Sequence, residues 1–232
     1  MSGFLPPVLP FLGAAGLFGL SCIFRFSCYP GFLERPITVA LIWGACSADW
    51  ETALPLGIFF ELFWMDLIGA GTYIPPNSNL PLLLCLFISS VFTPPGAALT
   101  SPPLVAIILS IPLAFLATGL EQRHRVRLNS LHEHWVEDRQ MDRPIGTAEI
   151  ALAILRLCLL EMLLFTGLGL ILYWLFKLAV SFSGHFPVSE NLGWPALWLT
   201  AVLGGLLSLR TRRAVVSLAV SLGILSILVL RG

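Results

Sequence analysis

The sequence predicts an all-α integral membrane protein, a polytopic helical bundle with re-entrant or half-spanning helices in its N-terminal half. Of its 232 residues, 57% are hydrophobic and only 11% are charged, whereas a soluble domain carries roughly 25% charged residues. Mean hydropathy is +0.89, and apolar stretches recur along nearly the whole chain. Proline and glycine interrupt several of these stretches, which is typical of helices that do not cross a membrane in one straight span. We expect a single membrane domain over residues 1–232.

The apolar stretches of the N-terminal half are too short, or too broken by proline and glycine, for regular spans of about 20 residues each. They cover residues 4–24, 35–50, 51–70, 80–92 and 97–120. The second and third of them meet at Asp49-Trp50-Glu51, which is too short for an aqueous loop between two full spans. Irregular backbone at membrane depth is tolerated only where it is buried in protein or lines a watery cavity. Residues 35–95 are therefore predicted to form a re-entrant substrate region.

The C-terminal half has a simpler pattern, and its basic residues predict an orientation. A hydrophilic loop is predicted over residues 121–146, followed by apolar helices over 148–182, 194–209 and 214–230. The predicted loop holds five Lys or Arg residues, the turn at 210–213 holds three, and the loop at 183–193 holds none. Because basic loops favour the cytoplasmic side, we expect the first two to be cytoplasmic and the C-terminus to be external.

Charge and motifs exclude several classes of function. The formal net charge is zero, so no overall basic field would attract nucleic acid. His132-Glu133-His134 invites a metal interpretation, but two histidines at i and i+2 face opposite sides of a helix, and a solvated face explains them better. The sequence contains no Walker, G-x-S-x-G or H-E-x-x-H motif. We expect no metal, no cofactor and no catalytic residue on this chain.

Ionisable residues inside the apolar stretches are the candidate functional residues. A charge near the bilayer centre costs at least ~2.5–3.5 kcal/mol, so such a residue usually faces a cavity or a partner. Carboxylates suit a sugar because each accepts hydrogen bonds from two hydroxyls, and nearby aromatic rings could stack on the pyranose. The alternative for Asp49 and Glu51 is that they are acids at a helix start, favoured by the macrodipole. The charged candidates are Arg35, Asp49, Glu51, Glu61, Asp66, Arg156 and Glu161, and the aromatic ones are Trp50, Phe63 and Trp64.

Spacing argues against pairing among these candidates. Glu61 and Asp66 lie five residues apart, which places their side chains about 140° apart on a continuous helix. Arg156 and Glu161 have the same spacing, so they are not an i,i+4 pair. An intramembrane enzyme that uses Glu61 with Asp66 is therefore disfavoured. Arg156 and Glu161 are interpreted first as structural ties to other helices.

Residues 35–79 carry a family resemblance, in the run RPITVALIWGACSADWETALPLGIFFELFWMDLIGAGTYIPPNSN. This run resembles the hallmark region of component IIC of mannose/sorbose-family phosphotransferase (PTS) transporters. That family has an Arg-Pro pair, a Gly, an Asp, a Glu twelve residues later, a Gly-rich stretch, and a Pro followed by a polar residue. The matching positions are Arg35-Pro36, Gly44, Asp49, Glu61, Gly69 to Gly71 and Pro76-Asn77.

The resemblance implies group translocation of a hexose or hexose derivative across the bacterial inner membrane. A IID membrane subunit would complete the channel, as a trimer of IIC–IID pairs with an elevator-like movement. Cytoplasmic IIA and IIB (IIAB) would carry the phosphoryl group, so none is expected on this chain. The predicted sugar-binding residues are Glu61, Asp66, Asn77 and Asn79, and the predicted structural or pathway residues are Arg35, Asp49, Arg156 and Glu161.

Departures from the family pattern leave the sugar open. Asn77 is an amide where the family usually has an acid, and Phe32, Asp66 and Gly69 also differ from the usual residues. A member with such changes could bind an unusual sugar or transport poorly. The alternative from a different class is a membrane scaffold or receptor subunit that transports nothing and binds a partner. Neighbouring genes for IID-like and IIAB-like proteins would favour transport over that alternative.

Overall fold

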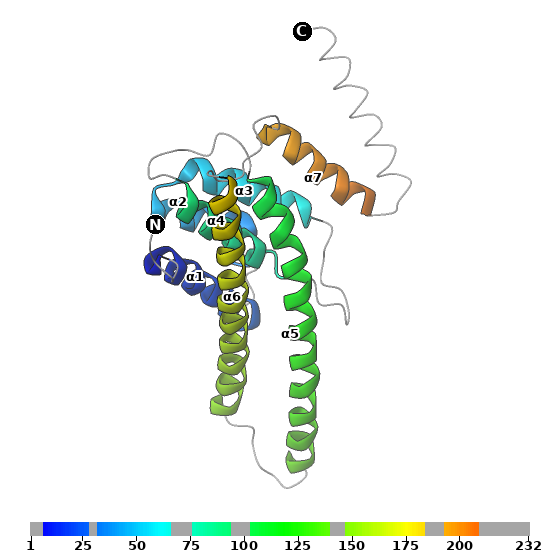
Figure 1. Ribbon diagram of the computed structural model, residues 1–232. Helices are drawn as coiled ribbons and strands as arrows, with labels where there is room; N and C mark the ends of the chain where they lie inside the picture. Colours follow the sequence, from blue (N-terminus) through cyan, green and yellow to red (C-terminus); the bar gives the residue numbers. More distant parts are fainter. Residues whose placement is uncertain are drawn as a thin grey trace.

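The computed structural model describes residues 7–27, 32–65, 76–93, 103–139, 147–183 and 193–208, and every regular element in these ranges is an α-helix. In chain order the helices are α1 (Val8–Ser27), α2 (Pro36–Ser47), α3 (Trp50–Phe63), α4 (Asn79–Phe92), α5 (Leu104–Arg139), α6 (Thr147–Ser183) and α7 (Trp194–Ser208). Two long helices, α5 and α6, stand side by side, and α1 to α4 gather along the upper part of this pair (Figure 1).

The two long helices contain segments that could span a membrane. Leu104–Arg123 in α5 and Ala151–Phe182 in α6 are long and apolar enough to cross a bilayer. Twenty helical residues extend about 30 Å, which matches the thickness of the hydrocarbon core. The prediction of an all-helical fold is confirmed for the described residues, and the two long apolar helices are consistent with a membrane protein.

Three consecutive helices are too short for a full span. The lengths of α2, α3 and α4 are 12, 14 and 14 residues, which correspond to about 18 to 21 Å. These lengths agree with half-spanning helices over residues 35–95. Their position in a bilayer stays a prediction.

The hydrophilic stretch after residue 120 needs a correction. The sequence predicts a loop over 121–146, whereas α5 continues as a helix to Arg139. No proline or glycine occurs between Gly119 and Pro144, and Glu, Gln, Arg and Leu in this stretch all favour helix. A helix that has already formed in the membrane therefore extends through the polar residues. Residues 140–146, and the apolar helix predicted over 214–230, lie outside the described residues.

Helices α2 and α3 form an antiparallel hairpin with a very short connection. Ala48 ends α2 in the left-handed conformation, with φ of 57° and ψ of 16°, and α3 begins at Trp50. Along the hairpin, Gly44 faces the ring of Trp50, and Gly57 faces Ala40. Small residues at both contacts let the two helices approach closely. The hairpin therefore turns at Ala48, and its base is the opposite end, where α2 begins and α3 ends.

Helix α4 lies at the centre of the fold. It contacts α1, α2, α3, α5 and α6, and nearly all of its side chains are buried. A helix that is apolar on all sides is expected to be buried in this way. Aromatic contacts connect α1 to α4 and to α6. Phe11 of α1 meets Phe87 of α4 edge to face with ring centroids 5.2 Å apart, and Phe18 of α1 stacks on Phe165 of α6 at 5.1 Å.

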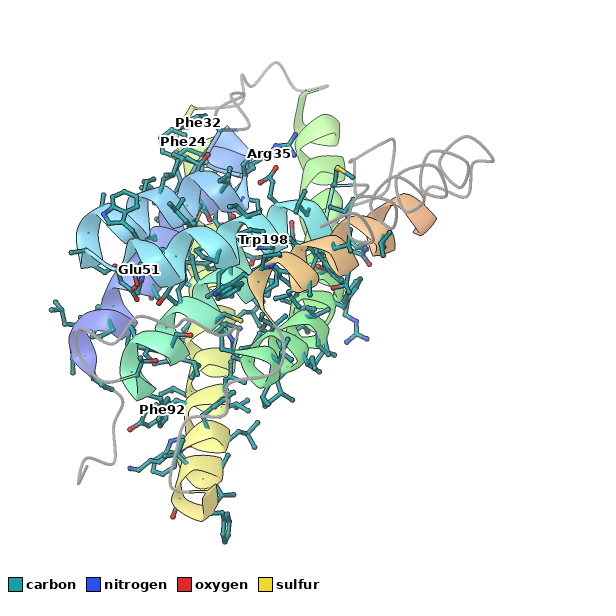
Figure 2. All side chains as sticks on the ribbon, turned by 90° about the horizontal axis from the view of Figure 1, so that it is seen from above. Phe24, Phe32, Arg35, Glu51, Phe92 and Trp198 are labelled. Atoms are coloured by element: carbon teal, nitrogen blue, oxygen red, sulfur yellow. The ribbon has the colours of Figure 1, made fainter. Side chains whose placement is uncertain are left out.

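Helix α7 packs on α3, on the outer side of the hairpin. The indole Nε1 of Trp198 donates a hydrogen bond to the carbonyl oxygen of Pro55 at 3.0 Å, and Figure 2 shows Trp198 between the two helices. About two turns further on, Gly205 lies beside the carbonyl of Leu62, where a Cβ would come within 3.3 Å of the oxygen. Two contacts therefore hold α7 along the length of α3.

Candidate functional site

Glu61, in the last turn of α3, reaches across the base of the hairpin to the start of α2. Its Oε1 accepts a hydrogen bond from Arg35 Nη1 at 3.0 Å, and its Oε2 accepts one from the backbone N–H of Ile37 at 3.4 Å. The Glu61 side chain is 25% exposed and that of Arg35 is 64% exposed. The carboxylate is thus a half-buried group with a distinct partner on each oxygen.

The start of α2 explains why Glu61 lies there. Arg35 occupies the N-cap position without a capping hydrogen bond from its side chain, and Pro36 follows it. Proline has no N–H, so Ile37 supplies the first helical N–H that needs an acceptor. A carboxylate at a helix N-terminus is also favoured by the helix macrodipole. Glu61 therefore caps α2 from a neighbouring helix and closes the hairpin at its base.

Asn77 and Asn79 organise the start of α4. Asn77 Oδ1 accepts the N–H of Asn79 at 3.2 Å, and Asn77 Nδ2 lies 3.8 Å from Cys22 Sγ. Asn79 Nδ2 donates to the carbonyl of Leu33 at 2.9 Å. Asn79 is only 1% exposed, and its Oδ1 has no hydrogen-bond partner among the described residues. An unpartnered buried acceptor is costly unless a ligand or water meets it.

Both predicted groups converge on the segment Leu33–Ile37. Glu61, in α3, accepts hydrogen bonds from Arg35 and Ile37 of this segment. Asn79, at the start of α4, donates one to the carbonyl of Leu33 at its other end. The structure thus brings Glu61 and Asn79, from separate parts of the sequence, to one short piece of chain that includes the predicted residue Arg35. A carboxylate and a buried amide oxygen beside one loop are groups that can accept hydrogen bonds from hydroxyls.

Asp66 lies outside the described residues. The angle of about 140° between Glu61 and Asp66 holds only for a continuous helix, and α3 ends at Phe63. That angle therefore does not apply to this pair.

Asp49 has the contacts of an acid at a helix start, which is the alternative interpretation given for it above. It is the N-cap of α3, and its Oδ1 accepts the N–H of Thr52 at 3.2 Å. This position is at the Ala48 end of the hairpin, whereas Glu61 is at the base. The described contacts of Asp49 are those of a helix-start acid.

Replacement of Asp49 tests this capping role. We expect Asp49→Ala to lower the free energy of unfolding by about 1 kcal/mol, because an orphan N–H of α3 loses its acceptor. Asp49→Asn should stay close to the wild type, since its amide oxygen can accept the same hydrogen bond. Thermal unfolding of the purified protein in detergent measures both. Equal losses in the two variants would contradict a simple cap and indicate a role for the charge.

Arg156 and Glu161 lie on different faces of α6. Glu161 is almost completely buried, whereas Arg156 is exposed. Different faces agree with the spacing argument against a direct pair. Their pathway role is not tested by these positions and stays a prediction.

The predicted aromatic platform is largely used within the chain. Trp64 is buried and stacks on Phe60 with ring centroids 5.4 Å apart, and Phe63 stacks on Phe59 at 5.7 Å. Trp50 keeps an exposed surface, but it lies near Ala48 and away from the base where Glu61 lies. The structure therefore does not place an open ring face of Phe63 and Trp64 together beside the carboxylate.

Sequence reasoning missed the backbone groups of the site. The N–H of Ile37 and the carbonyl of Leu33 are contacts that no side-chain motif encodes. One signal was present, because Pro36 at the first helical position marks a helix start whose next N–H needs an acceptor. The identity of that acceptor depends on the hairpin register.

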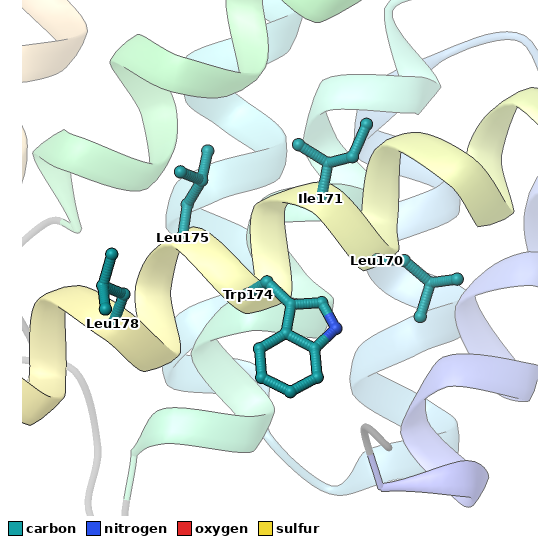
Figure 3. Close-up of a pocket in the computed structure, with 5 residues that line it drawn as sticks. All are labelled: Leu170, Ile171, Trp174, Leu175 and Leu178. Carbon is teal, nitrogen blue, oxygen red and sulfur yellow. The ribbon is translucent and has the colours of Figure 1, made fainter. Parts of the chain in front are cut away.

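A shallow hollow on α6 does not suit a sugar. It has a volume of about 460 Å³ and is lined by Leu170, Ile171, Trp174, Leu175 and Leu178 (Figure 3). All five residues belong to the membrane-length part of α6. A sugar site needs several convergent hydrogen-bonding groups, so this apolar hollow fits the membrane-facing surface of the helix.

Two helices of membrane length, together with a hairpin of short helices that has a carboxylate and an amide near its base, are consistent with a helical membrane protein that carries a polar site. The family model of the PTS system sorbose-specific IIC component matches residues 13–204. The chain therefore belongs to this family, which makes it a sugar-transport subunit of a phosphotransferase system. No curated protein matches the chain. The family match confirms the resemblance carried by residues 35–79.

Proposed function

We propose that this chain is the IIC subunit of a mannose/sorbose-type, phosphoenolpyruvate-dependent phosphotransferase system and imports a hexose or hexose derivative. The observation that carries the proposal is the half-buried Glu61 carboxylate at the base of the α2–α3 hairpin. A charged group in a short apolar helix is retained at a cost, and such groups usually face a substrate pathway. The family match supplies the class of substrate.

The sugar would be held by acceptors from two helices. Glu61 can accept hydrogen bonds from two adjacent hydroxyls, and charged acceptors form stronger hydrogen bonds than neutral ones. Asn79 Oδ1, which has no partner among the described residues, would accept a third. Asn77 orients Asn79 through its bond to the Asn79 N–H. Asp66 is proposed as a further sugar contact on the sequence pattern alone.

The partners and the membrane are proposed on the basis of the family match. A IID membrane subunit would complete the pathway, in a trimer of IIC–IID pairs, and cytoplasmic IIA and IIB would phosphorylate the sugar as it emerges. The chain would lie in the bacterial inner membrane as a multi-pass protein with the α2–α3 hairpin re-entrant. Half-length helices support this placement, because a re-entrant hairpin needs no full span.

Sugar uptake with Glu61→Gln is the direct test. We expect uptake of labelled sorbose to fall about tenfold or more, because charged hydrogen bonds to the sugar are lost. Glutamine keeps an oxygen that can accept the Ile37 N–H, so the hairpin base should stay closed. The measurement uses cells that lack the native subunit and carry either the wild type or the variant, with mannose, glucose and fructose as further probes.

Glu34→Gln is the matched control. Glu34 is exposed, and its replacement by Gln removes the same charge within the segment Leu33–Ile37. Sugar uptake by this variant should therefore equal that of the wild type. Wild-type uptake by Glu61→Gln at equal protein level would contradict the proposal. Unchanged uptake in cells without the subunit would also contradict it.

A scaffold or receptor subunit is the second candidate, and one observation favours it. Both oxygens of Glu61 already have partners within the chain, as a purely structural carboxylate would. A scaffold predicts that Glu61→Gln changes partner retention or stability without changing uptake. Comparison of uptake with co-purification of the partner subunits separates the two.

A further inference from the structure

We infer that Arg35 occupies the place on Glu61 that a sugar hydroxyl takes in the loaded site, so that the sugar and Arg35 compete for one carboxylate oxygen. This inference rests on the proposed function of Glu61 as a sugar contact and assigns to Arg35 a role in setting the affinity. The described conformation is then the closed, sugar-free form of the site.

The two contacts of Glu61 differ in kind. Oε2 is directed to the N–H of Ile37, a backbone group at the fixed start of α2. Oε1 is directed to Arg35, whose side chain is long and 64% exposed. The first contact can persist while the second is exchanged. Exchange at Oε1 therefore leaves the hairpin base capped.

Accessibility places the sugar on the same side as Arg35. Glu61 is only 25% exposed, and its guanidinium partner is the more exposed member of the pair. A ligand that approaches from water thus meets Arg35 first. To reach Oε1, a hydroxyl has to displace the guanidinium.

The ion pair is weak enough to be displaced. Arg35 and Glu61 meet through a single Nη1–Oε1 contact, without the second parallel bond of a bidentate arginine. Exposed pairs of this kind contribute little to stability because both charges remain partly hydrated. A fixed salt bridge with the same residues would be bidentate and buried. The geometry therefore suits an exchangeable counter-ion.

Arg35→Gln in membrane vesicles tests the competition, with labelled sorbose, mannose, glucose and fructose as probes. We expect Arg35→Gln to bind the transported sugar about fivefold more tightly than the wild type, because the competitor is gone. Arg35→Lys should fall between the two. Arg123→Gln, which removes an exposed arginine from α5, should bind like the wild type.

Ionic strength supplies a readout that a structural role would not move. Salt screens the exposed Arg35–Glu61 pair, so wild-type sugar affinity should rise from 50 mM to 500 mM salt, whereas that of Arg35→Gln should stay constant.

Equal or weaker sugar binding by both Arg35 variants, or a salt-independent wild type, would overturn the competition while leaving Glu61 as a sugar contact. If Arg35→Gln does not fold, Arg35→Lys and the wild-type salt series still decide. No binding of any probe by the wild type would instead refute the proposed function, and the inference with it.

Discussion

Gly57→Ala is expected to lower the free energy of unfolding by about 3 kcal/mol, at the high end of the costs of overpacking a tight contact. A Cβ at position 57 would overlap the Cβ of Ala40, and it would lie 3.5 Å from the Cα of Ile37 and 3.6 Å from the oxygen of Pro36. None of these atoms belongs to a flexible side chain, so the strain cannot be relieved by a rotamer change. The two helices have to move apart.

Separation of α2 from α3 would also affect the site. The same face of the hairpin carries the contact between Glu61 and Ile37, at a length of 3.4 Å that leaves little room for further stretching. We therefore expect Gly57→Ala to lose sugar uptake together with stability. Thermal unfolding in detergent and uptake at matched expression measure the two effects.

Gly167→Ala is the control for the change of glycine to alanine itself. A Cβ at Gly167 in α6 meets nothing within 4 Å. Alanine in an open helical position stabilises by about 0.5–1 kcal/mol relative to glycine. Similar destabilisation by Gly57→Ala and Gly167→Ala would show that helix contact at position 57 is not the cause.

Phe165→Ala is expected to cost about 3 kcal/mol, the lower end of the range for Phe→Ala in packed cores. Phe165 is completely buried, stacks on Phe18 with centroids 5.1 Å apart, and lies 6.5 Å from Phe11. Its ring therefore joins α6 to α1. Within a membrane the loss comes chiefly from packing, because the ring exchanges protein contacts for lipid contacts and not for water.

Leu163→Ala is the matched control on the same helix. Leu163 is 70% exposed, so its truncation should change the free energy of unfolding by no more than about 0.5 kcal/mol. Denaturation of both variants in the same detergent gives the comparison. A Phe165→Ala variant as stable as Leu163→Ala would argue that the contact between α1 and α6 does not hold the fold together.

Helix positions could be predicted where an apolar stretch is bounded by polar residues. The predicted helices at 148–182 and 194–209 correspond to α6 (Thr147–Ser183) and α7 (Trp194–Ser208). The polar part of α5 was not predicted, because low hydropathy was interpreted as a loop. Helix propensity is independent of hydropathy, and a stretch without proline or glycine can continue a helix out of the membrane.

The site was predictable only in part. Glu61 was predicted because a charge in apolar surroundings usually faces a cavity or a partner, whereas Asn79 was named only together with the family resemblance. The pairing of Arg35 with Glu61 was not predicted, since the two residues are 26 positions apart and meet only through the antiparallel register of α2 on α3. That register depends on Ala48 in a left-handed conformation and on close contact at Gly57, which spacing rules on a single helix do not describe.

The hydrogen bond between Trp198 and Pro55 determines how many helices can shift as a unit. The indole is anchored on the middle of α3, and Gly205 lets α7 lie close to the end of the same helix. Any tilt or rise of the hairpin would therefore carry α7 along and would involve three helices. Its contact area with the surrounding lipid would grow accordingly, and bilayer thickness and fluidity would act on the rate of the movement through α7 as well as through the hairpin.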